Sequence, residues 1–407
     1  MATETAATGA GPYDFDRAVD RHGTWCTQWD YVEDRFGVPG LLPFTISDMD
    51  FETAPEVMRA LRGRLEHAVL GYSRWRHEDF LGAVVDWYQR RHDTPVRPES
   101  LAYAPSVLYQ AGVLIDLWSR PGDGVVTHTP AYDAFPRLVA AHGRELRGCA
   151  PDDWAEFERL LALPDTSVLL LCSPHNPTGH VWTAAELGRM AELCARHGVA
   201  VISDEIHADL THAPHVHRPW PNYATAQGDD ARWAVVTSAS KSFNIPALTG
   251  SYGMIGDPDS HAAYLSRLKD ADGLSSPAVL MLTATIAAYR EGAPWLDALR
   301  AYVSDNLRLV SDRLDAAFPE LRWRPPEAGY LAWIDLRRLG VDDEALQRRL
   351  IEHEKVAIMP GTAYGAPGFV RLNVGCPREK AERGVEALVR ALRATTGGSA
   401  AGGSAAR

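Results

Sequence analysis

Continuous apolar runs alternate with amphipathic stretches through the middle of the chain. Between two of these runs, the sequence Thr-Ala-Ala-Glu at 183–186 is a capping box, which predicts a helix that continues to about His197 and stops at Gly198. Apolar runs without polar interruption are typical of strands buried on both faces. Their alternation with helices predicts a mostly parallel sheet with right-handed crossovers. The predicted strands are at residues 124–128, 167–172, 199–203 and 234–237.

The chain on both sides of this region is mainly helical. A second capping-box sequence, Thr-Ala-Pro-Glu at 53–56, predicts a helix to about His67, and a further helix is expected over 78–91. From about residue 277 to 318 the pattern is helical again. The remaining part mixes the two patterns and predicts a smaller α+β domain, with strands at 330–335 and 369–373 and helices at about 342–354 and 378–393.

These patterns predict an α/β protein in five segments. Both ends are small, polar and rich in Ala, Thr and Gly, a composition typical of disordered chain. An aromatic and charged stretch without clear periodicity follows the first of them. In order, we expect a disordered N-terminus at 1–11, an N-terminal arm at 12–50 that joins the small domain, a large domain at 51–292, a small C-terminal domain at 293–394 and a flexible tail at 395–407.

Composition limits the classes to which the chain can belong. Its 407 residues are 46% hydrophobic and 23% charged, enough to build a sizeable core in two domains. The net charge of −12 argues against nucleic acid as the main partner. The five cysteines form no C-x-x-C pair, which fits a reducing cytoplasm. We find neither a signal-peptide pattern nor an apolar run of the ~18 residues that a membrane span needs, so we expect a cytoplasmic protein without membrane contact.

Three polar side chains follow three of the predicted strands, each within four residues of the strand end. Asn176 follows the second strand, Asp204 the third and Lys241 the fourth. The carboxyl ends of parallel strands meet at one edge of a sheet, and ligands of open α/β sheets bind at that edge. We therefore expect these three side chains to lie close together in a ligand site.

The three residue types fit pyridoxal phosphate, an aldehyde with a pyridine ring and a phosphate. The amine of Lys241 can form a Schiff base if burial and neighbouring cations lower its pKa. The carboxylate of Asp204 can keep a pyridine nitrogen protonated, and Asn176 can donate to the phenolic oxygen. The hydroxyls of Ser238 and Ser240 are suited to hold a phosphate. Each motif alone also fits a plainer structure, namely a surface lysine in a serine-rich loop, a helix N-cap and a turn, but all three at one edge are hard to reach by chance.

Two further stretches can complete such a site. Ser106 and the backbone amides of Val107 and Leu108 precede an apolar run and can hold a phosphate at a helix N-terminus, although the turn contains no glycine. Tyr132 follows another strand and can stack on a ring, but a core tyrosine is an equally good interpretation of that position.

A cluster of four histidines raises the possibility of a metal site. Prolines at 214 and 219 break any helix in this stretch, and the spacing matches no standard metal site. We therefore predict no metal at His207, His212, His215 and His217.

Motifs along nearly the whole chain resemble those of the fold type I pyridoxal-phosphate enzymes, the class I/II aminotransferase-like group. Within that group they are most similar to the MalY/PatB-type cystathionine β-lyases. The matching stretches are VDRHGTWCTQWDY at 19–31, LPFTISDMDF at 42–51, GYSRW at 71–75, THTPAYDAF at 127–135, SKSFNIPALTG at 240–250, DGLSSP at 272–277, EKVAIMPG at 354–361, FVRLNVGCP at 369–377, and the segments 171–179 and 201–207.

The resemblance implies roles around the cofactor ring. Lys241 would carry the Schiff base and act as the catalytic base, and Asp204 would pair with the pyridine nitrogen. Asn176 would bind the ring hydroxyl and Tyr132 would stack on the ring. His207 would also contact the cofactor; it stands where the broader aminotransferase family has a tyrosine, a departure that agrees with the β-lyase subgroup.

The resemblance also implies how the phosphate and the substrate are bound. Ser106 with the next two amides, and Ser238, would hold the phosphate. Tyr72 would reach the phosphate of the neighbouring subunit, which makes the active unit a homodimer. Arg371 would bind the substrate α-carboxylate, a bidentate task that suits a guanidinium. Thr249 replaces an arginine of the broader family, so phosphate binding must depend more on hydroxyls.

The activity implied is that of a carbon–sulfur β-lyase, which cleaves cystathionine-like thioethers to a thiol, pyruvate and ammonia. An aminotransferase on the same scaffold is the alternative, because it shares the first half of the reaction and differs in needing a keto acid. A regulatory protein-binding partner with secondary lyase activity is a further alternative from another class. Residues 1–18 are too few for a helix-turn-helix domain before the first family motif.

Overall fold

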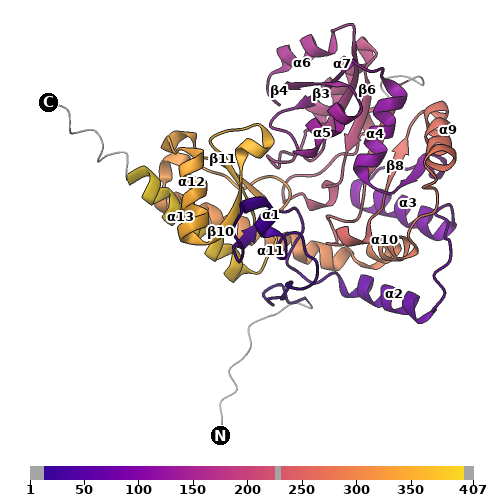
Figure 1. The fold of residues 1–407 in the computed structure, drawn as a ribbon. Coiled ribbons are helices and arrows are strands. Elements are labelled where there is room, and N and C mark those ends of the chain that lie inside the picture. The colour runs from indigo at the N-terminus through magenta and orange to yellow at the C-terminus, as the bar shows by residue number, and fades with distance from the viewer. Residues whose placement is uncertain (1–12, 225–230, 398–407) are drawn as a thin grey trace.

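The computed structural model describes residues 13–224 and 231–397, which fold around two separate β-sheets (Figure 1). The predicted disordered segment 1–11 lies outside the described residues, and so does the predicted tail beyond residue 397. No helix within these ranges is both long and apolar enough to cross a membrane. All five cysteines lie within them, buried and without a disulfide.

The larger sheet has seven strands among the described residues, in the order β2-β8-β7-β6-β5-β3-β4. The strands from β7 to β4 are parallel, whereas β8 runs antiparallel to both of its neighbours. The predicted α/β fold with a mostly parallel sheet is therefore confirmed, and all four predicted strands lie within one residue of their expected bounds. The strands are β2 (Leu101–Ala104), β3 (Gly124–His128), β4 (Glu145–Cys149), β5 (Thr166–Cys172), β6 (Ala200–Asp204), β7 (Trp233–Thr237) and β8 (Ser251–Ile255).

The helices of this region begin and end at local sequence signals. In α7 the hydroxyl of Thr183 accepts the N–H of Glu186, whose carboxylate accepts the N–H of Thr183, and Gly198 ends the helix at φ 67°. The capping box is thus confirmed. The helices are α2 (Pro55–Glu66), α3 (Glu78–His92), α4 (Val107–Trp118), α5 (Ala134–Ala141), α6 (Trp154–Leu161), α7 (Ala184–His197), α8 (Pro221–Ala224), α9 (Pro258–Ser266) and α10 (Val279–Glu291).

The second predicted capping box, at 53–56, is wrong. Helix α2 has Ala54 at its N-cap, and no side chain caps it. The hydroxyl of Thr53 is used elsewhere, because it donates to the carbonyl of Asn244 at 3.2 Å. Here a tertiary contact overrides the local signal.

The smaller sheet combines the N-terminal arm with the C-terminal part of the chain. Its order is β1-β10-β11-β9 among the described residues, and β1 of the arm pairs parallel with β10. Helix α13 packs against α11 and this sheet. On these two sheets we base the proposal of a large domain at 51–292 and a small domain at 293–394 joined by the arm. The elements are α1 (Val32–Phe36), β1 (Leu42–Phe44), α11 (Ala293–Ala317), β9 (Leu331–Asp335), α12 (Asp343–Arg349), β10 (Val356–Pro360), β11 (Phe369–Asn373) and α13 (Arg378–Gly397).

Two local expectations about these ends need correction. Helix α1 interrupts the arm, which was expected to be irregular. Helix α13 continues to Gly397, so the first three residues of the predicted tail are helical. The hydroxyls of Thr395 and Thr396 donate to carbonyls one turn back, which continues the helical pattern beyond the expected end.

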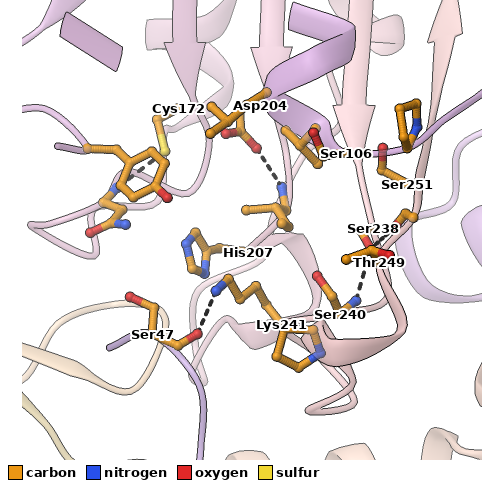
Figure 2. A pocket seen from close by; sticks show the side chains of 18 residues that line it. Ser47, Ser106, Cys172, Asp204, His207, Ser238, Ser240, Lys241, Thr249 and Ser251 are labelled. Carbon is orange, nitrogen blue, oxygen red and sulfur yellow. Dashed lines mark hydrogen bonds between the residues drawn. The ribbon is translucent and has the colours of Figure 1, made fainter. Parts of the chain in front are cut away.

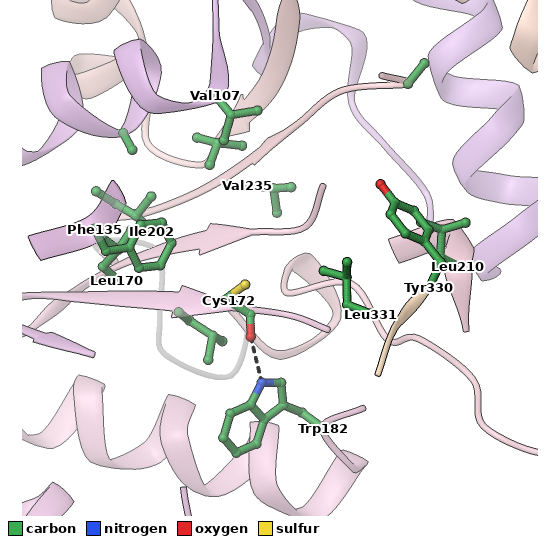
Figure 3. Close-up of a cluster of buried hydrophobic side chains, with 14 of the residues drawn as sticks. Val107, Phe135, Leu170, Cys172, Trp182, Ile202, Leu210, Val235, Tyr330 and Leu331 are labelled. Atoms are coloured by element: carbon green, nitrogen blue, oxygen red, sulfur yellow. Dashed lines mark hydrogen bonds between the residues drawn. The ribbon is translucent and has the colours of Figure 1, made fainter. Parts of the chain in front are cut away.

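The core lies along the parallel strands. Leu170, Ile202 and Val235 on β5, β6 and β7 are all fully buried (Figure 3). The indole N–H of Trp182 donates to the carbonyl of Cys172 at 2.9 Å, which fixes the segment after β5 beneath the end of that strand. The sheet therefore offers a rigid edge on which polar side chains can be placed.

The capping box of α7 gives a test of these assignments. Thr183→Ala should lower the free energy of unfolding by about 1 kcal/mol, because the N–H of Glu186 loses its side-chain acceptor at the helix start. Thr183→Ser keeps the hydroxyl and should stay close to the wild type. Urea unfolding followed by circular dichroism would measure both variants, and equal midpoints for Ala and Ser would contradict the cap.

Candidate active site

The carboxyl edge of the large sheet opens into a cavity of about 210 Å³. Its polar walls come from the ends of β5, β6 and β7 and from the N-terminus of α4 (Figure 2). Asp204 pairs with Cys172 and with Val236 in the sheet register, so the three strand ends lie level. The cavity is lined by Ser47, Pro105, Ser106, Val107, Leu108, Tyr132, Cys172, Asn176, Asp204, Ile206, His207, Ser238, Ser240, Lys241, Pro246, Thr249, Gly250 and Ser251.

Lys241 lies in the turn after β7 and is partly buried. Its Nζ donates to the backbone carbonyl of Ser47 at 2.5 Å (Figure 2). Burial lowers the pKa of this amine to about 8, helped by the nearby charge of Arg371 and opposed by Asp48 and Asp204. A pKa near neutrality leaves a useful fraction of the amine unprotonated, as a nucleophile or a general base requires.

Asp204 is the last residue of β6, whereas the sequence predicted that the strand would end at Ser203, one residue before it. One carboxylate oxygen accepts the N–H of Ile206 at 3.1 Å. Burial, with a smaller contribution from the neighbouring Glu205, raises the pKa of this carboxyl to about 7 against the opposing effects of the Ile206 N–H and Lys241. A cationic ligand group in the cavity would lower this pKa again, since an opposite charge favours the ionised form.

His207 lies beside Lys241 in the cavity wall (Figure 2). Burial lowers the pKa of its imidazole to about 3, and the charges of Lys241 and Arg371 add to the effect. His207 is therefore neutral at physiological pH. Tyr132 lines the same cavity, and its pKa is raised by burial and by Asp133, so its phenol is also neutral.

The other end of the cavity is rich in hydroxyl and backbone donors. Ser106 caps α4 by accepting the N–H of Tyr109 at 3.1 Å. The first amides of a helix have no acceptor within it, so those of Val107 and Leu108 are available to a ligand. Ser238 donates to the carbonyl of Gly250 at 2.8 Å. These donors fit a phosphate.

Arg371 on β11 comes from the small sheet and is buried. Its guanidinium donates to the carbonyl of Thr45 at 2.8 Å and to the side-chain oxygen of Asn176 at 3.4 Å. It also lies 4.5 Å above the ring of Tyr364. Its Nε is buried without a hydrogen-bond partner among the described residues. A buried donor without a partner is costly, and a ligand carboxylate would satisfy it.

The structure brings together nearly all of the side chains that the sequence nominated. Nine of them line the cavity, namely Ser106, Val107, Leu108, Tyr132, Asn176, Asp204, His207, Ser238 and Lys241. Arg371 adjoins it through Asn176. Tyr72 is different: it lies in the segment between α2 and α3 and is fully exposed, at 101%.

The sequence reasoning missed residues that enter the cavity from outside the strand ends. Ser47 contributes only a backbone carbonyl, which no residue pattern reveals, and the only signal was its place in the motif at 42–51. Tyr330 donates to the same carbonyl at 2.9 Å. Cys172 at the end of β5 belongs to the buried core and also lines the cavity, where its sulfur accepts the N–H of Asn176.

The four clustered histidines make separate contacts. His207 lines the cavity, His212 contacts the carbonyl of Gly329 at 2.7 Å, and His217 contacts the buried Glu205 at 3.0 Å. His215 lies near the carboxylate of Glu327. In the part of the chain that the structure describes, no three His, Cys, Asp or Glu side chains are grouped to hold a metal ion.

Comparisons with known proteins agree with this geometry. Residues 39–388 match the family described as Aminotransferase class I and II. Protein MalY of Escherichia coli (strain K12) is 57% identical, over 94% of this chain and 99% of that protein. Cystathionine beta-lyase PatB of Bacillus subtilis (strain 168) is 36% identical, over 93% and 99%. The solved structure of the PLP-bound C-S lyase from Staphylococcus hominis is similar with a TM-score of 0.87 at 26% identity, over 94% and 99%.

The chain therefore belongs to the aminotransferase class I and II family. Within that family, its identity to MalY and PatB over almost their whole lengths puts it in the MalY/PatB-type group. The resemblance found in the sequence motifs is confirmed.

The buried carboxyl of Asp204 predicts an unusual gain of stability on mutation. In the ligand-free protein its pKa of about 7 lies above the unfolded value of about 3.9. Its contribution to stability is therefore lost as pH rises from about 4 to 7. Asp204→Asn does not titrate, so its melting temperature should exceed that of the wild type above pH 7, by a margin that shrinks towards pH 4.

Asp209 is the matched control for this prediction. It is also buried, but the hydrogen bond and charge of His92 outweigh burial and lower its pKa. Asp209→Asn should therefore melt below the wild type at pH 8. Thermal unfolding of both ligand-free variants from pH 4 to 8 measures the contrast, and a lower melting temperature for Asp204→Asn at pH 8 would contradict it.

Proposed function

We propose that the protein is a pyridoxal-phosphate-dependent carbon–sulfur β-lyase acting on cystathionine-like thioether amino acids. The observation that carries this proposal is the convergence of Lys241, Asp204 and Asn176 in one cavity, at the level ends of three adjacent parallel strands. The names of its relatives PatB and the Staphylococcus hominis C-S lyase support the same activity.

The residues present fit pyridoxal phosphate at both ends of the cavity. At one end the Lys241 amine lies ready to bind an aldehyde carbon, and Asp204 offers a carboxyl whose raised pKa a pyridinium would relieve. At the other end, hydroxyls and the first amides of α4 offer donors to a phosphate. These donors come from Ser106, Val107, Leu108 and Ser238. Asn176, Tyr132 and His207 line the same cavity and would contact the ring.

Pyridoxal phosphate, when bound, supplies an electron sink for negative charge at the substrate Cα. The chain supplies the groups that act on the substrate. Arg371 holds the α-carboxylate through the donor that is otherwise unpaired. The Lys241 amine, with its lowered pKa, would take the proton from Cα as a general base. Neutral His207 adds no charge beside that amine.

Elimination of a thiolate from Cβ, which takes up a proton to become the thiol, would then leave an aminoacrylate. Water hydrolyses the aminoacrylate to pyruvate and ammonia, and no keto acid is needed. No observation in the described residues favours aminotransfer or a regulatory partner over this activity. A cytoplasmic location stays a prediction from the unpaired cysteines.

We further propose that the active unit is a homodimer in which Tyr72 contacts the cofactor phosphate of the partner subunit. The side chain of Tyr72 is fully exposed in the single chain. Leu65, Val69 and Leu70 nearby are exposed as well, at 52%, 65% and 61%. An exposed apolar segment of this kind is typical of a surface that another protein covers.

The central test measures product formation from cystathionine in the absence of any keto acid. The wild type should release pyruvate and free thiol in equal amounts. Lys241→Ala should lose several orders of magnitude in rate, because the covalent anchor and the general base disappear together; general acid–base catalysis alone contributes about 10²–10⁴-fold. Lys269→Ala is the control, since Lys269 is exposed and does not line the cavity, and it should keep the wild-type rate.

Two results would reject this function. Without pyruvate from the wild type, the lyase proposal fails. If borohydride reduction links the cofactor to a peptide that lacks Lys241, the assignment of the base fails.

Mixed dimers test the role of Tyr72. A Tyr72→Phe subunit and a Lys241→Ala subunit are each impaired when paired with themselves. If Tyr72 acts across the interface, the mixed dimer has one site with both defects and one site with neither. Refolding the two variants together should therefore restore about half of the wild-type activity in that species, as expected for independent isologous sites. Activity that stays at the level of the separate variants would place Tyr72 outside the partner's site.

A further inference from the structure

Residues 45–51 form a short segment, here named the strap, which runs between the catalytic lysine and the small sheet. Two of its backbone carbonyls accept hydrogen bonds from the site. Ser47 accepts the Lys241 amine at 2.5 Å (Figure 2), and Thr45 accepts the Arg371 guanidinium at 2.8 Å. The two groups that would act on the same substrate are thus docked two residues apart on one piece of backbone.

An asparagine from each side holds the strap. Asn244, three residues after Lys241, accepts the N–H of Met49 at 3.0 Å and donates to the carbonyls of Met49 and Phe51 at 2.9 and 2.8 Å. Asn373, two residues after Arg371, donates to the carbonyls of Ile46 and Asp48 at 2.6 and 2.8 Å.

Among the described residues the strap has no neighbouring strand, and the two asparagines supply the hydrogen-bond partners that a neighbouring strand would give to its backbone. A side-chain amide is suited to this task because it donates and accepts at once. Asn244 adopts a left-handed φ of 53°, which asparagine tolerates better than most residues. Arg21 adds ion pairs to Asp48 and Asp50, which attach the same segment to the N-terminal arm.

We propose that Asn244 and Asn373 are positioning residues, which act through the strap to set the Lys241 amine relative to the Arg371 guanidinium. In an amino-acid substrate the carboxylate is bonded directly to the carbon that loses its proton. The base and the carboxylate-binding group therefore need a fixed separation, and a misplacement of about 1 Å can cost about 100-fold in rate. The proposal rests on the proposed function for the identity of the substrate, but not for the state of the lysine.

The strap also controls how much water reaches the lysine. Ser47 forms part of the cavity wall, and burial is the main cause of the lowered Lys241 pKa. Asp48, Asp204 and Arg371 are the charged groups that act on this amine. A loosened strap would admit water and would move Asp48 away, and of these two effects loss of burial is the larger. The pKa of Lys241 should then rise from about 8 towards its ordinary value.

The first test uses the ligand-free protein, so it does not depend on lyase activity. Trace labelling with acetic anhydride at graded pH, with quantification of the labelled peptides by mass spectrometry, gives the apparent pKa of Lys241. Exposed Lys269 serves as the internal reference. Asn244→Gly, which keeps the left-handed backbone accessible, and Asn373→Ala should each raise the apparent pKa of Lys241 by about one unit. Thr127→Val is the matched control, because it removes a buried hydrogen bond to a carbonyl, that of Leu170, without touching the strap.

The second test compares two substrates in the holoenzyme. One is a cysteine thioether and the other is the same thioether amine without its carboxylate. Both asparagine variants should lower kcat for the amino acid by up to about 100-fold. They should also lower the ratio of kcat for the amino acid to kcat for the amine, because that ratio depends on the correct separation of the Lys241 amine and the Arg371 guanidinium. The control should keep the wild-type ratio. If both variants fold and keep the wild-type labelling profile, the asparagines only stabilise the fold and the proposal is overturned, whatever the lyase assay shows.

Discussion

The register of β5, β6 and β7 is the constraint on which the rest of the site depends. Cys172, Asp204 and Val236 lie level across three parallel strands, so the residues that follow them start from the same edge of the sheet. The strands hold this register because their side chains are apolar on both faces and buried completely, as at Leu170, Ile202 and Val235. A shift of one residue in any strand would turn its side chains to the opposite face and would separate Asp204 from Lys241. The apolar core therefore fixes the polar edge.

The small sheet adds what a parallel sheet edge cannot provide. The lining of the cavity contains a single cation, Lys241, among the described residues, so a group for an α-carboxylate must come from elsewhere. Strand β11 supplies Arg371, and β1 of the arm, paired to β10, leads directly into the strap that contacts both cations. Chain segments more than 300 residues apart thus meet at one point. Pairing of the arm with the small sheet is what makes the site a joint product of the two sheets.

Features of the fold and site that depend on neighbouring residues could be predicted from the sequence, and features that depend on contacts far along the chain could not. Strands β3, β5, β6 and β7 were predictable because burial on both faces leaves a local apolar pattern, and α7 because its cap is made of neighbouring residues. The cap expected at Thr53 failed because Asn244 recruits that hydroxyl from far along the chain. The contact of Ser47 with Lys241 could not be predicted either, because the two residues are far apart in the sequence and a backbone carbonyl has no sequence signature. Long-range polar contacts to the backbone are what the sequence conceals.

The electrostatics of the ligand-free cavity explain what kind of ligand it is built for. Burial moves each ionisable group towards its neutral form: it lowers the pKa of Lys241, His207 and Arg371 and raises that of Asp204. A site whose charges stabilised one another would show the opposite shifts at its ion pairs, as the hydrogen bond and charge of His92 produce at Asp209. Burial therefore disfavours the charged form of each of these groups, and a neutral ligand would not change that. A ligand that brings a cation to Asp204 and a carboxylate to Arg371 stabilises the charged form of both side chains. Its binding energy is then greatest at the groups that hold and orient it.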